Sequence, residues 1–346
     1  MVGLRKNVCL EWLSSLVDPK VAVNSMRSVA GDASFRSYHR VMKQEGCGSF
    51  IVMDAPPGQE DISPFILTTE KLIAAGVRAP AILAQNKTQG FLLLEDFGDQ
   101  TFLSAVREHH VADTLLYEKA LKILVKIQAN ADVSGLKPYC ADKLLQEMSL
   151  FEQWFVNRHC AANLTAQEQA WLQSIQSYLV DSALAEGSVF VHRDYHSRNL
   201  MVLPQQQTQG TELDLGVLDH QDAVVGPVSY DVVSLLRDAY VTWPEERTLD
   251  WAIRYWEQAR QAGIQIPSDP SEFYRQFDYM GLQRHLKVLG IFARLNYRDN
   301  KPNYLNDLPT VLAYVRQVAA RYSQLKPLNR ILDRLHNNSA QVGYTF

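Results

Sequence analysis

The chain has 346 residues, of which 47% are hydrophobic and 21% charged, and its formal net charge is -4. This length allows about two domains or two lobes of one domain, and the composition is that of a folded globular protein. The slight acidity excludes the basic surface that attracts a nucleic-acid backbone. The sequence lacks the run of about 18 apolar residues that a membrane-spanning helix requires.

The N-terminal segment MVGLRKNVCLEWLSSL lacks the long apolar core and small-residue cleavage site of a secretory signal, and its leucines predict a short amphipathic helix instead. Cys9, Cys47, Cys140 and Cys160 form no C-x-x-C pair. This spacing favours reduced, packed thiols over disulfides or a zinc site. We therefore expect a cytoplasmic protein.

The first hundred or so residues are rich in strand signals. Three runs predict strands and are followed by a helix over residues 63–76, opened by Ser63-Pro64 and closed by Gly76; the runs are MRSVAG, SFRSYHRVM and FIVMDAPPG. A further strand, GFLLLEDFG, leads into a polar turn. The predicted order is strand, turn, strand, strand, helix, strand, strand.

Helical patterns dominate after Thr101. They cover residues 111–129, 141–158, 165–185 and 229–335. Two short apolar runs interrupt them and predict a hairpin, LMVL at 200–203 and GVLDH at 216–220. We therefore expect an α+β chain with two lobes, residues 1–97 and residues 98–346.

The segment FVHRDYHSRNLMV, residues 190–202, concentrates charged and polar side chains between two apolar ends. Its spacing H-R-D-x-x-x-x-N matches the catalytic loop of protein kinases, and Asp219 follows Asn199 by twenty residues. Phosphoryl transfer needs a carboxylate to accept the proton of the attacking hydroxyl and hard oxygen ligands for Mg²⁺. Asp194 fits the first role, and Asn199 and Asp219 fit the second. The alternative is a solvated turn whose Asp and Asn cap local backbone.

Segments along most of the chain carry a family resemblance. They are AGDASFRSYHR, IVMDAPPGQE, LLLEDFGD, FVHRDYHSRNLMV, LDHQDAVVGPVSYDVVSLLRD and GLQRHLKVLGIFARL. The chain resembles the aminoglycoside phosphotransferase and choline kinase superfamily, whose fold is protein-kinase-like: an N-terminal antiparallel sheet with one main helix, and a mostly helical C-terminal lobe with a small β-hairpin at the active site. Within it, the chain is most similar to the bacterial cell-wall-recycling kinases that phosphorylate the anomeric hydroxyl of N-acetylmuramate and N-acetylglucosamine.

The resemblance implies a nucleotide site in the N-terminal lobe. The phosphate loop GDASFR would let backbone N–H groups approach phosphates closely, and the connector LLLEDFG would read adenine. The residues assigned to nucleotide are Gly31, Asp32, Ala33, Ser34, Phe35, Arg36, Glu95 and Phe97. An ordinary hairpin turn and a plain strand end are the competing interpretations.

The resemblance also implies supporting and acceptor-binding residues. Asp231 would brace the catalytic loop through backbone hydrogen bonds, although a carboxylate in the first turn of a helix is favourable by itself. His192 and Glu70 are assigned supporting roles. The candidates for acceptor binding are His196, Glu147, Trp154, Arg284 and Arg294. Alternatively, Trp154 belongs to the core and the arginines are solvated or ion-paired.

One feature departs from the protein-kinase pattern. The third strand reads SFIVMDAPP, so Met53 or Asp54 stands where a phosphate-binding lysine is expected, and Glu70 lacks its usual partner. A methionine cannot bind phosphate. We expect Arg36 to supply the missing cation, with Arg40 or Lys43 behind it.

The leading interpretation is an ATP- and Mg²⁺-dependent kinase for an amino sugar, monomeric and without a nucleic-acid or membrane partner. A second interpretation keeps the chemistry but changes the acceptor to an aminoglycoside, choline, homoserine or a methylthio-sugar. A third is a degenerate kinase that binds nucleotide without catalysis, supported by the missing lysine alone.

Overall fold

The computed structural model describes residues 3–31, 35–109, 111–203 and 213–341. The chain forms two compact units, each made from two stretches of sequence. Unit 1 is Met1–Val111 with Arg198–Asp222, and unit 2 is Ala112–Ser197 with Ala223–Phe346. The chain therefore passes from unit 2 to unit 1 inside the polar loop and back again after the hairpin. The functional division at residue 97 stays a prediction.

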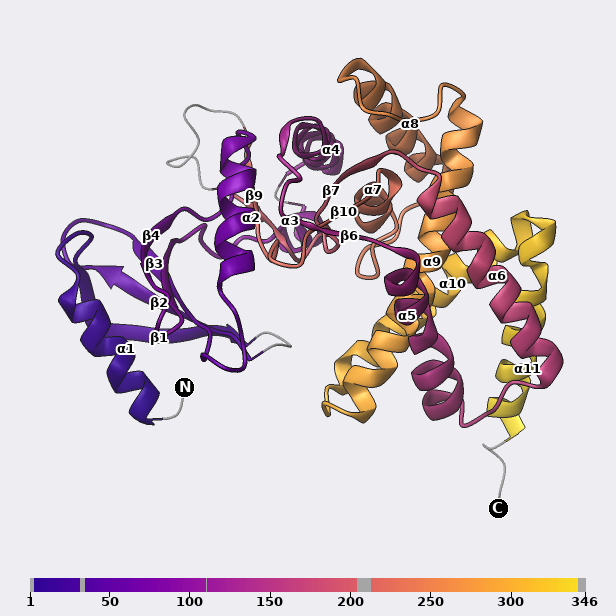
Figure 1. Cartoon of the computed structure of the whole chain (residues 1–346), viewed down its shortest axis with the longest axis horizontal. Coiled ribbons are helices and arrows are strands. Elements are labelled where there is room, and N and C mark those ends of the chain that lie inside the picture. The colour runs from indigo at the N-terminus through magenta and orange to yellow at the C-terminus, as the bar shows by residue number, and fades with distance from the viewer. Residues whose placement is uncertain (1–2, 32–34, 110, 204–212, 342–346) are drawn as a thin grey trace. The chain divides into compact units, whose positions relative to one another are not determined.

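Unit 1 is built on a five-stranded antiparallel sheet with the strand order β1-β2-β3-β5-β4 (Figure 1). The strands are β1 (Val21–Gly31), β2 (Ser37–Lys43), β3 (Ser49–Asp54), β4 (Ile82–Asn86) and β5 (Phe91–Glu95), and the helices are α1 (Gly3–Ser15), α2 (Ser63–Ala74) and α3 (Phe102–Arg107). The predicted order of strands and helix is confirmed. The short helix α3 was not predicted.

The two faces of this sheet are covered by different helices. Side chains alternate along a strand, so Val52 packs with Trp12 of α1 while its neighbour Met53 packs with Phe65 of α2. Strand β5 is buried along both faces for the same reason, which explains its unbroken apolar run.

Helix α2 has the ends that its sequence indicates. Pro64 lies in the first turn, where a missing N–H leaves no hydrogen bond unmade. At the other end the N–H of Ala75 donates to the carbonyl of Lys71 at 3.0 Å, and Gly76 adopts a φ of 74°, which glycine tolerates without strain.

The predicted hairpin is confirmed and belongs to unit 1. Strand β8 (Leu200–Val202) pairs antiparallel with β9 (Leu215–Val217), and residues 204–212 between them lie outside the described part of the chain. The N–H of Val202 donates to the carbonyl of Gln100 at 2.8 Å. This bond fixes the hairpin to the segment that follows β5.

Unit 2 is mostly helical and has one small sheet of order β6-β10-β7. The strands are β6 (Lys137–Pro138), β7 (Ser188–Val191) and β10 (Val224–Pro227). The α-helices are α4 (Asp113–Asn130), α5 (Ala141–Leu150), α6 (Ala166–Leu184), α7 (Ser229–Leu236), α8 (Glu245–Gln261), α9 (Pro270–Tyr297), α10 (Leu308–Arg321) and α11 (Lys326–Gln341). A π-helix, η1 (Phe151–His159), and two 3₁₀ turns, η2 (Pro302–Asp307) and η3 (Ser323–Leu325), complete the unit.

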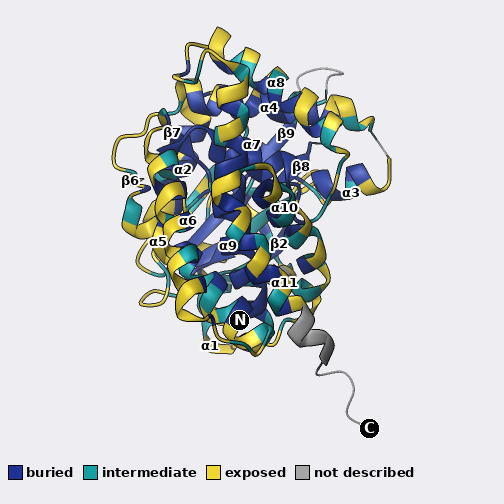
Figure 2. Ribbon diagram, turned by 90° about the vertical axis from the view of Figure 1, so that its right-hand side faces the viewer, coloured by how far each residue is buried: buried dark blue, intermediate teal, exposed yellow. Residues whose placement is uncertain are grey.

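Helix α9 is the centre of unit 2 and is buried along most of its length (Figure 2). Residues 277–290 are buried without interruption, because α5, α6, α7, α10 and η1 all pack on this helix. A Cβ on Gly290 would lie 2.3 Å from the carbonyl carbon of Leu150, so the two backbones touch there. Several polar side chains of α9 are buried as a result.

The helix expected over residues 141–158 is divided. Helix α5 ends at Leu150, and the π-helix η1 continues to His159, with the N–H of Cys160 donating to the carbonyl of Phe155 at 2.9 Å. The change of helix type coincides with the contact at Gly290. Hydrophobic spacing alone does not distinguish the two helix types.

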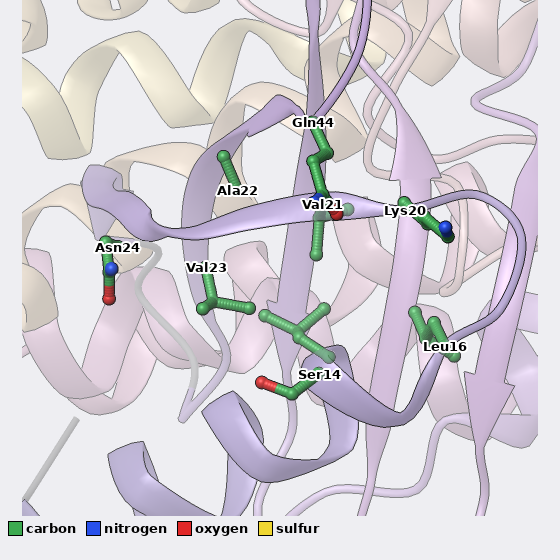
Figure 3. A pocket seen from close by; sticks show the side chains of 9 residues that line it. Ser14, Leu16, Lys20, Val21, Ala22, Val23, Asn24 and Gln44 are labelled. Atoms are coloured by element: carbon green, nitrogen blue, oxygen red, sulfur yellow. The ribbon is translucent and has the colours of Figure 1, made fainter.

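A groove of about 450 Å³ lies in unit 1 between the end of α1 and the start of β1 (Figure 3). It is lined by Leu13, Ser14, Leu16, Lys20, Val21, Ala22, Val23, Asn24 and Gln44. None of these residues was assigned to the site by the sequence. Within the described ranges, no helix combines the length and apolarity needed to cross a membrane.

Candidate active site

The polar loop of residues 192–197 follows the buried strand β7 and is fixed to helix α7. Asp231, in the first turn of α7, accepts hydrogen bonds from the backbone N–H of His192 at 2.6 Å and of Arg193 at 3.0 Å. These are the backbone contacts that the resemblance implied for Asp231. His192 itself is fully buried, and its Nδ1 accepts from the N–H of Asp194 at 3.2 Å. The loop is therefore held up to the candidate base.

The far end of the loop has a second anchor that the sequence did not reveal. The backbone N–H of Ser197 donates to Asp238 at 3.0 Å, and the Ser197 hydroxyl also contacts that carboxylate. Both residues are buried. Two aspartates thus hold the loop, one before and one after Asp194.

The carboxyl of Asp194 lies among positive charges. Burial raises its pKa, but Lys287, His196, Arg284 and Arg193 together lower it to about 2. Asp194 is therefore ionised at neutral pH and able to accept a proton. Lys287 and Arg284 come from α9, one turn apart, and both are buried.

Glu147 belongs to a buried ionic network in unit 2. It pairs with Arg193 of the loop and with Lys287 at 3.3 Å, and it accepts a hydrogen bond from the hydroxyl of Tyr139. Lys287 also donates to the hydroxyl of Tyr230 at 3.0 Å. Burial raises the pKa of Glu147, and the two cations more than offset this and keep the carboxyl ionised. The predicted role of Glu147 in acceptor binding stays a prediction, and its pair with Arg193 connects it to the polar loop.

The other acceptor candidates occupy varied environments. Arg284 is 4% exposed, and its Nε has no hydrogen-bond partner among the described residues. The ring of His196 packs edge-on against Tyr240, with centroids 5.5 Å apart. Trp154 is half-buried on η1, and Arg294 is half-buried on α9. Their role in acceptor binding stays a prediction.

The hairpin of unit 1 brings the two predicted metal ligands together. Asn199 precedes β8 and Asp219 follows β9, and the Asn199 amide lies 3.4 Å from Asp219 Oδ2. The N–H of Leu218 donates to the carbonyl of Asn199 at 2.9 Å, which locks the two ends of the hairpin. Gln221 donates to the other oxygen of Asp219 at 2.7 Å. The pairing of β8 with β9 is what places these oxygen donors side by side.

The connector after β5 contacts the base of the hairpin, also within unit 1. Phe97 packs with Met201, Leu203 and Leu218. A Cβ on Gly216 would lie 2.4 Å from the Phe97 ring, so only glycine fits beneath it. Glu95 pairs with Arg78 at 2.6 Å.

The predicted phosphate loop is described only in part. Asp32, Ala33 and Ser34 lie outside the described residues, and Gly31 ends strand β1. Phe35 is 67% exposed, and its N–H donates to Glu60 at 3.1 Å. Arg36 is half-buried between this loop and β2.

The position of the missing lysine is occupied by structural residues. Met53 is fully buried in the core under α2. Asp54 pairs with Arg5 of α1, whose Nε donates to it at 2.7 Å. Within the described ranges the exposed Glu70 has neither hydrogen bond nor ion pair, so its expected supporting contact is not seen.

Arg40 and Lys43, the two cations expected behind Arg36, have different surroundings. Arg40 was a candidate for phosphate binding, but its guanidinium is committed to Asp96 at 2.5 Å and to Asp99 at 2.6 Å. Strand β2 lies inside the sheet and buries Arg40, and its role behind Arg36 stays a prediction. Lys43 lies over the ring of Phe50, 5.2 Å from its centroid.

All residues assigned to nucleotide and metal lie in unit 1, whereas Asp194 and the acceptor candidates lie in unit 2. A loop carboxylate held by backbone bonds, followed by a hairpin bearing an amide and a carboxylate, is the arrangement of a kinase-like phosphotransferase. Solved structures share the fold. A choline kinase from Streptococcus pneumoniae superposes with a TM-score of 0.62 at 14% identity, covering 91% of this chain and all of that chain.

Sequence comparison is more specific. Residues 25–266, more than half of the chain, match the model of the phosphotransferase enzyme family, and the chain belongs to this family. It is 43% identical over 317 residues to an N-acetylmuramate/N-acetylglucosamine kinase of Pseudomonas putida, covering 91% of this chain and 90% of the relative. It is 45% identical over 307 residues to the protein of the same name from Pseudomonas aeruginosa, covering 88% and 87%. Family membership implies ATP as phosphate donor and a small-molecule acceptor.

Proposed function

We propose that this chain transfers the γ-phosphate of ATP to the anomeric hydroxyl of N-acetylmuramate or N-acetylglucosamine, a step in the recycling of cell-wall sugars. The observation that carries the proposal is the identity of 43% and 45% to kinases of that name along about nine tenths of the chain. The presence of Asp194, Asn199 and Asp219 argues against a degenerate kinase, because a chain that only binds nucleotide needs neither a base nor two metal ligands.

Asp194 is the proposed general base. Lys287, Arg284 and Arg193 keep its carboxylate ionised, and Asp231 fixes the backbone just before it. Asp194 would orient the sugar hydroxyl and take its proton while the sugar oxygen bonds to the γ-phosphorus and the bond to the ADP oxygen breaks. Much of the rate would come from positioning, because this reaction asks little covalent work of the protein.

Asn199 and Asp219 are the proposed ligands of Mg²⁺. Amide and carboxylate oxygens are the hard donors this ion prefers, and the two side chains are 3.4 Å apart. As placed, the Asn199 nitrogen faces Asp219, and a flip of the amide presents its oxygen instead. Two protein ligands suit Mg²⁺, which usually completes its shell with water and substrate phosphates. The bound ion would neutralise charge on the phosphates.

The charges near Asp194 favour a particular class of acceptor. Lys287, Arg284 and Arg193 are the side chains that act on Asp194, and Lys287 and Arg284 are buried. Such a site repels a cationic alcohol and suits a neutral sugar or one that carries a carboxylate. It therefore favours an amino sugar over choline, although choline kinases share the fold.

Arg36 is the proposed substitute for the strand lysine. Met53 is buried, Asp54 is paired with Arg5, and Arg40 is committed to two aspartates. Arg36 is the last residue of the predicted phosphate loop in the sequence and is half-buried. Loss of ATP affinity in Arg36→Ala, with the fold intact, would support this assignment.

Phosphorus NMR of a reaction with N-acetylmuramate, ATP and Mg²⁺ tests the proposal directly. The expected product has a phosphate that couples to the anomeric proton of the sugar. Removal of Mg²⁺ with EDTA should stop the reaction. Transfer to choline or an aminoglycoside in place of the sugar would sink the acceptor assignment, and absence of any ATP turnover would favour the degenerate kinase.

A further inference from the structure

His220, the residue after Asp219, is clamped by helix α2 within unit 1. Its Nδ1 lies 2.9 Å from the hydroxyl of Thr68, and its Nε2 lies 3.3 Å from the hydroxyl of Thr69. The imidazole ring also packs on Phe65 of the same helix, with centroids 4.7 Å apart. His220 is fully buried, and both threonines are 1% exposed. This clamp, formed by His220, Thr68 and Thr69, is therefore a buried contact between α2 and the segment after the hairpin.

The hydrogen bonds of the clamp are mutually consistent for one form of the ring. The Thr68 hydroxyl lies 2.7 Å from the carbonyl of Pro64, so its only proton has a backbone acceptor. Its oxygen then accepts from the Nδ1–H of His220. The Nε2 of a neutral ring is left as an acceptor, and the Thr69 hydroxyl supplies the proton. Each ring nitrogen of His220 thus has a threonine hydroxyl as partner.

This clamp acts on a strained residue. Asp219 has a φ of 58°, in the left-handed region that a residue with a side chain adopts at a cost of about 1 kcal/mol or more. Such a conformation persists only where its flanks are fixed. Leu218 is held by its bond to the carbonyl of Asn199, and His220 is held by α2. Asp219 is thus strained between two anchors.

The protein-kinase pattern links this helix to the third strand through a lysine–glutamate ion pair, and among the described residues Met53 and Glu70 do not form one. Met53 is buried in the core, and Glu70 of α2 is exposed to solvent. Helix α2 presents Thr68 and Thr69 on its inner face instead, next to the buried Phe65. The helix is therefore linked to the metal-ligand segment directly and not through a strand lysine.

We propose that His220 is a positioning residue that couples helix α2 to the Mg²⁺ ligand Asp219. The proposal rests on the proposed function, because it takes Asp219 as a metal ligand. Without the clamp, Asp219 would relax from its left-handed conformation and its carboxylate would leave the position next to Asn199. The loss would therefore appear in Mg²⁺-dependent nucleotide binding and not in nucleotide binding as such.

Two sets of variants test the coupling. His220→Phe keeps the ring on Phe65 but removes both hydrogen bonds, and the double variant Thr68→Val with Thr69→Val removes them from the side of α2. Calorimetry would measure ADP affinity with Mg²⁺ and with EDTA. We expect ADP affinity in Mg²⁺ to fall about tenfold, the effect of one or two lost hydrogen bonds, and ADP affinity in EDTA to stay unchanged. The Mg²⁺ concentration for half-maximal turnover should rise by a similar factor, with the acceptor KM unaltered.

Further variants separate the alternatives. His220→Gln can keep one bond to a threonine and should give an intermediate loss. Thr248→Val removes a buried threonine hydroxyl in unit 2 and controls for general destabilisation. Equal loss of ADP affinity in Mg²⁺ and EDTA, or a lowered melting temperature with unchanged Mg²⁺ dependence, would make the clamp merely structural. Asp219→Asn should abolish the Mg²⁺ effect on ADP affinity; if it does not, the metal assignment itself fails and not the coupling alone.

Discussion

Asp231 Oδ2 accepts a hydrogen bond from the backbone N–H of His192 at 2.6 Å, two residues before the candidate base, and its other oxygen accepts from Arg193. An asparagine here has one acceptor oxygen, and its NH₂ group would face an N–H donor. We expect Asp231→Asn to lower kcat about tenfold or more by releasing the loop, and to leave ADP affinity in Mg²⁺ unchanged. Steady-state kinetics and calorimetry would measure the two quantities.

Ser234→Ala provides the matched control on the same helix. The Ser234 hydroxyl is buried and has no partner among the described residues, so its removal should change neither quantity. If Asp231→Asn turned over sugar at the full rate, the bonds to His192 and Arg193 would have no part in catalysis.

Asp194→Asn is the direct test of the base. The amide cannot accept the hydroxyl proton in this step, and general-base catalysis typically contributes about 10²- to 10⁴-fold. We expect kcat to fall by about that factor while ADP still binds, because the nucleotide residues belong to unit 1. Asp181→Asn, an exposed change on α6, serves as control. Turnover at the native rate in Asp194→Asn would show that Asp194 is not the general base.

The elements and the loop were predictable from the sequence for specific reasons. Apolar runs bounded by Gly and Pro indicated the strands around Met53. The spacing of Asp194 and Asn199 is a local motif, so the loop could be recognised without knowing the fold. The hairpin was recognisable because its two apolar runs flank a polar turn. These signals are short-range, and the structure confirms the elements at nearly the expected bounds.

The remaining features depend on contacts that are distant in sequence. Lys287 reads as a solvated helix lysine, but α9 is enclosed by its neighbours and buries it beside Glu147. Arg40 was expected behind Arg36 as a phosphate-binding cation, yet it pairs with Asp96, which lies fifty-six residues away in the sequence. His220 has no local signal at all, because its partners on α2 lie about 150 residues earlier. The burial and pairing of these side chains depend on tertiary contacts, which local sequence patterns do not reveal.

Gly216→Ala should weaken nucleotide binding selectively. The added Cβ would stand 2.4 Å from the Phe97 ring, so the ring must move from its place against Met201 and Leu203. We expect KM for ATP to rise and KM for the sugar to stay the same. Gly187→Ala is the matched control: its added Cβ would be crowded to a similar degree, 2.2 Å from the Gln265 carbonyl oxygen, but in unit 2. Similar ATP KM values in both variants would exclude Phe97 from the adenine site.

Arg284→Met tests how an acidic acceptor is recognised. The guanidinium is 4% exposed and acts on Asp194, and its Nε has no hydrogen-bond partner within the part of the chain that the structure describes. Methionine has a similar volume and no charge. N-acetylmuramate carries a carboxylate and N-acetylglucosamine does not. We expect KM for N-acetylmuramate to rise about tenfold, as for a lost charged hydrogen bond, and KM for N-acetylglucosamine to change much less. Arg260→Met on α8 is the control, and equal changes for both sugars would contradict carboxylate binding.

Glu186 makes stability depend on pH. Burial raises its pKa from 4.5 to about 7, although the N–H of Ser229 at 3.0 Å and the Ser229 hydroxyl at 2.9 Å both lower it. The folded state therefore binds a proton more tightly than the unfolded state. Its contribution is fully present below pH 4.5 and is lost as pH rises through 7, by about 3 kcal/mol.

Glu186→Gln removes this dependence without leaving an unpaired group. The Gln oxygen accepts from the Ser229 N–H, and its NH₂ donates to the Ser229 hydroxyl. Urea unfolding at pH 5 and pH 7.5 would compare the proteins. We expect the native chain to lose more stability than Glu186→Gln between these values, and Glu246→Gln, exposed on α8, to match the native chain. Asp231, whose pKa burial also raises to about 7, accounts for the dependence that remains in the variant. Identical losses in all three proteins would mean that Glu186 is already ionised at pH 5.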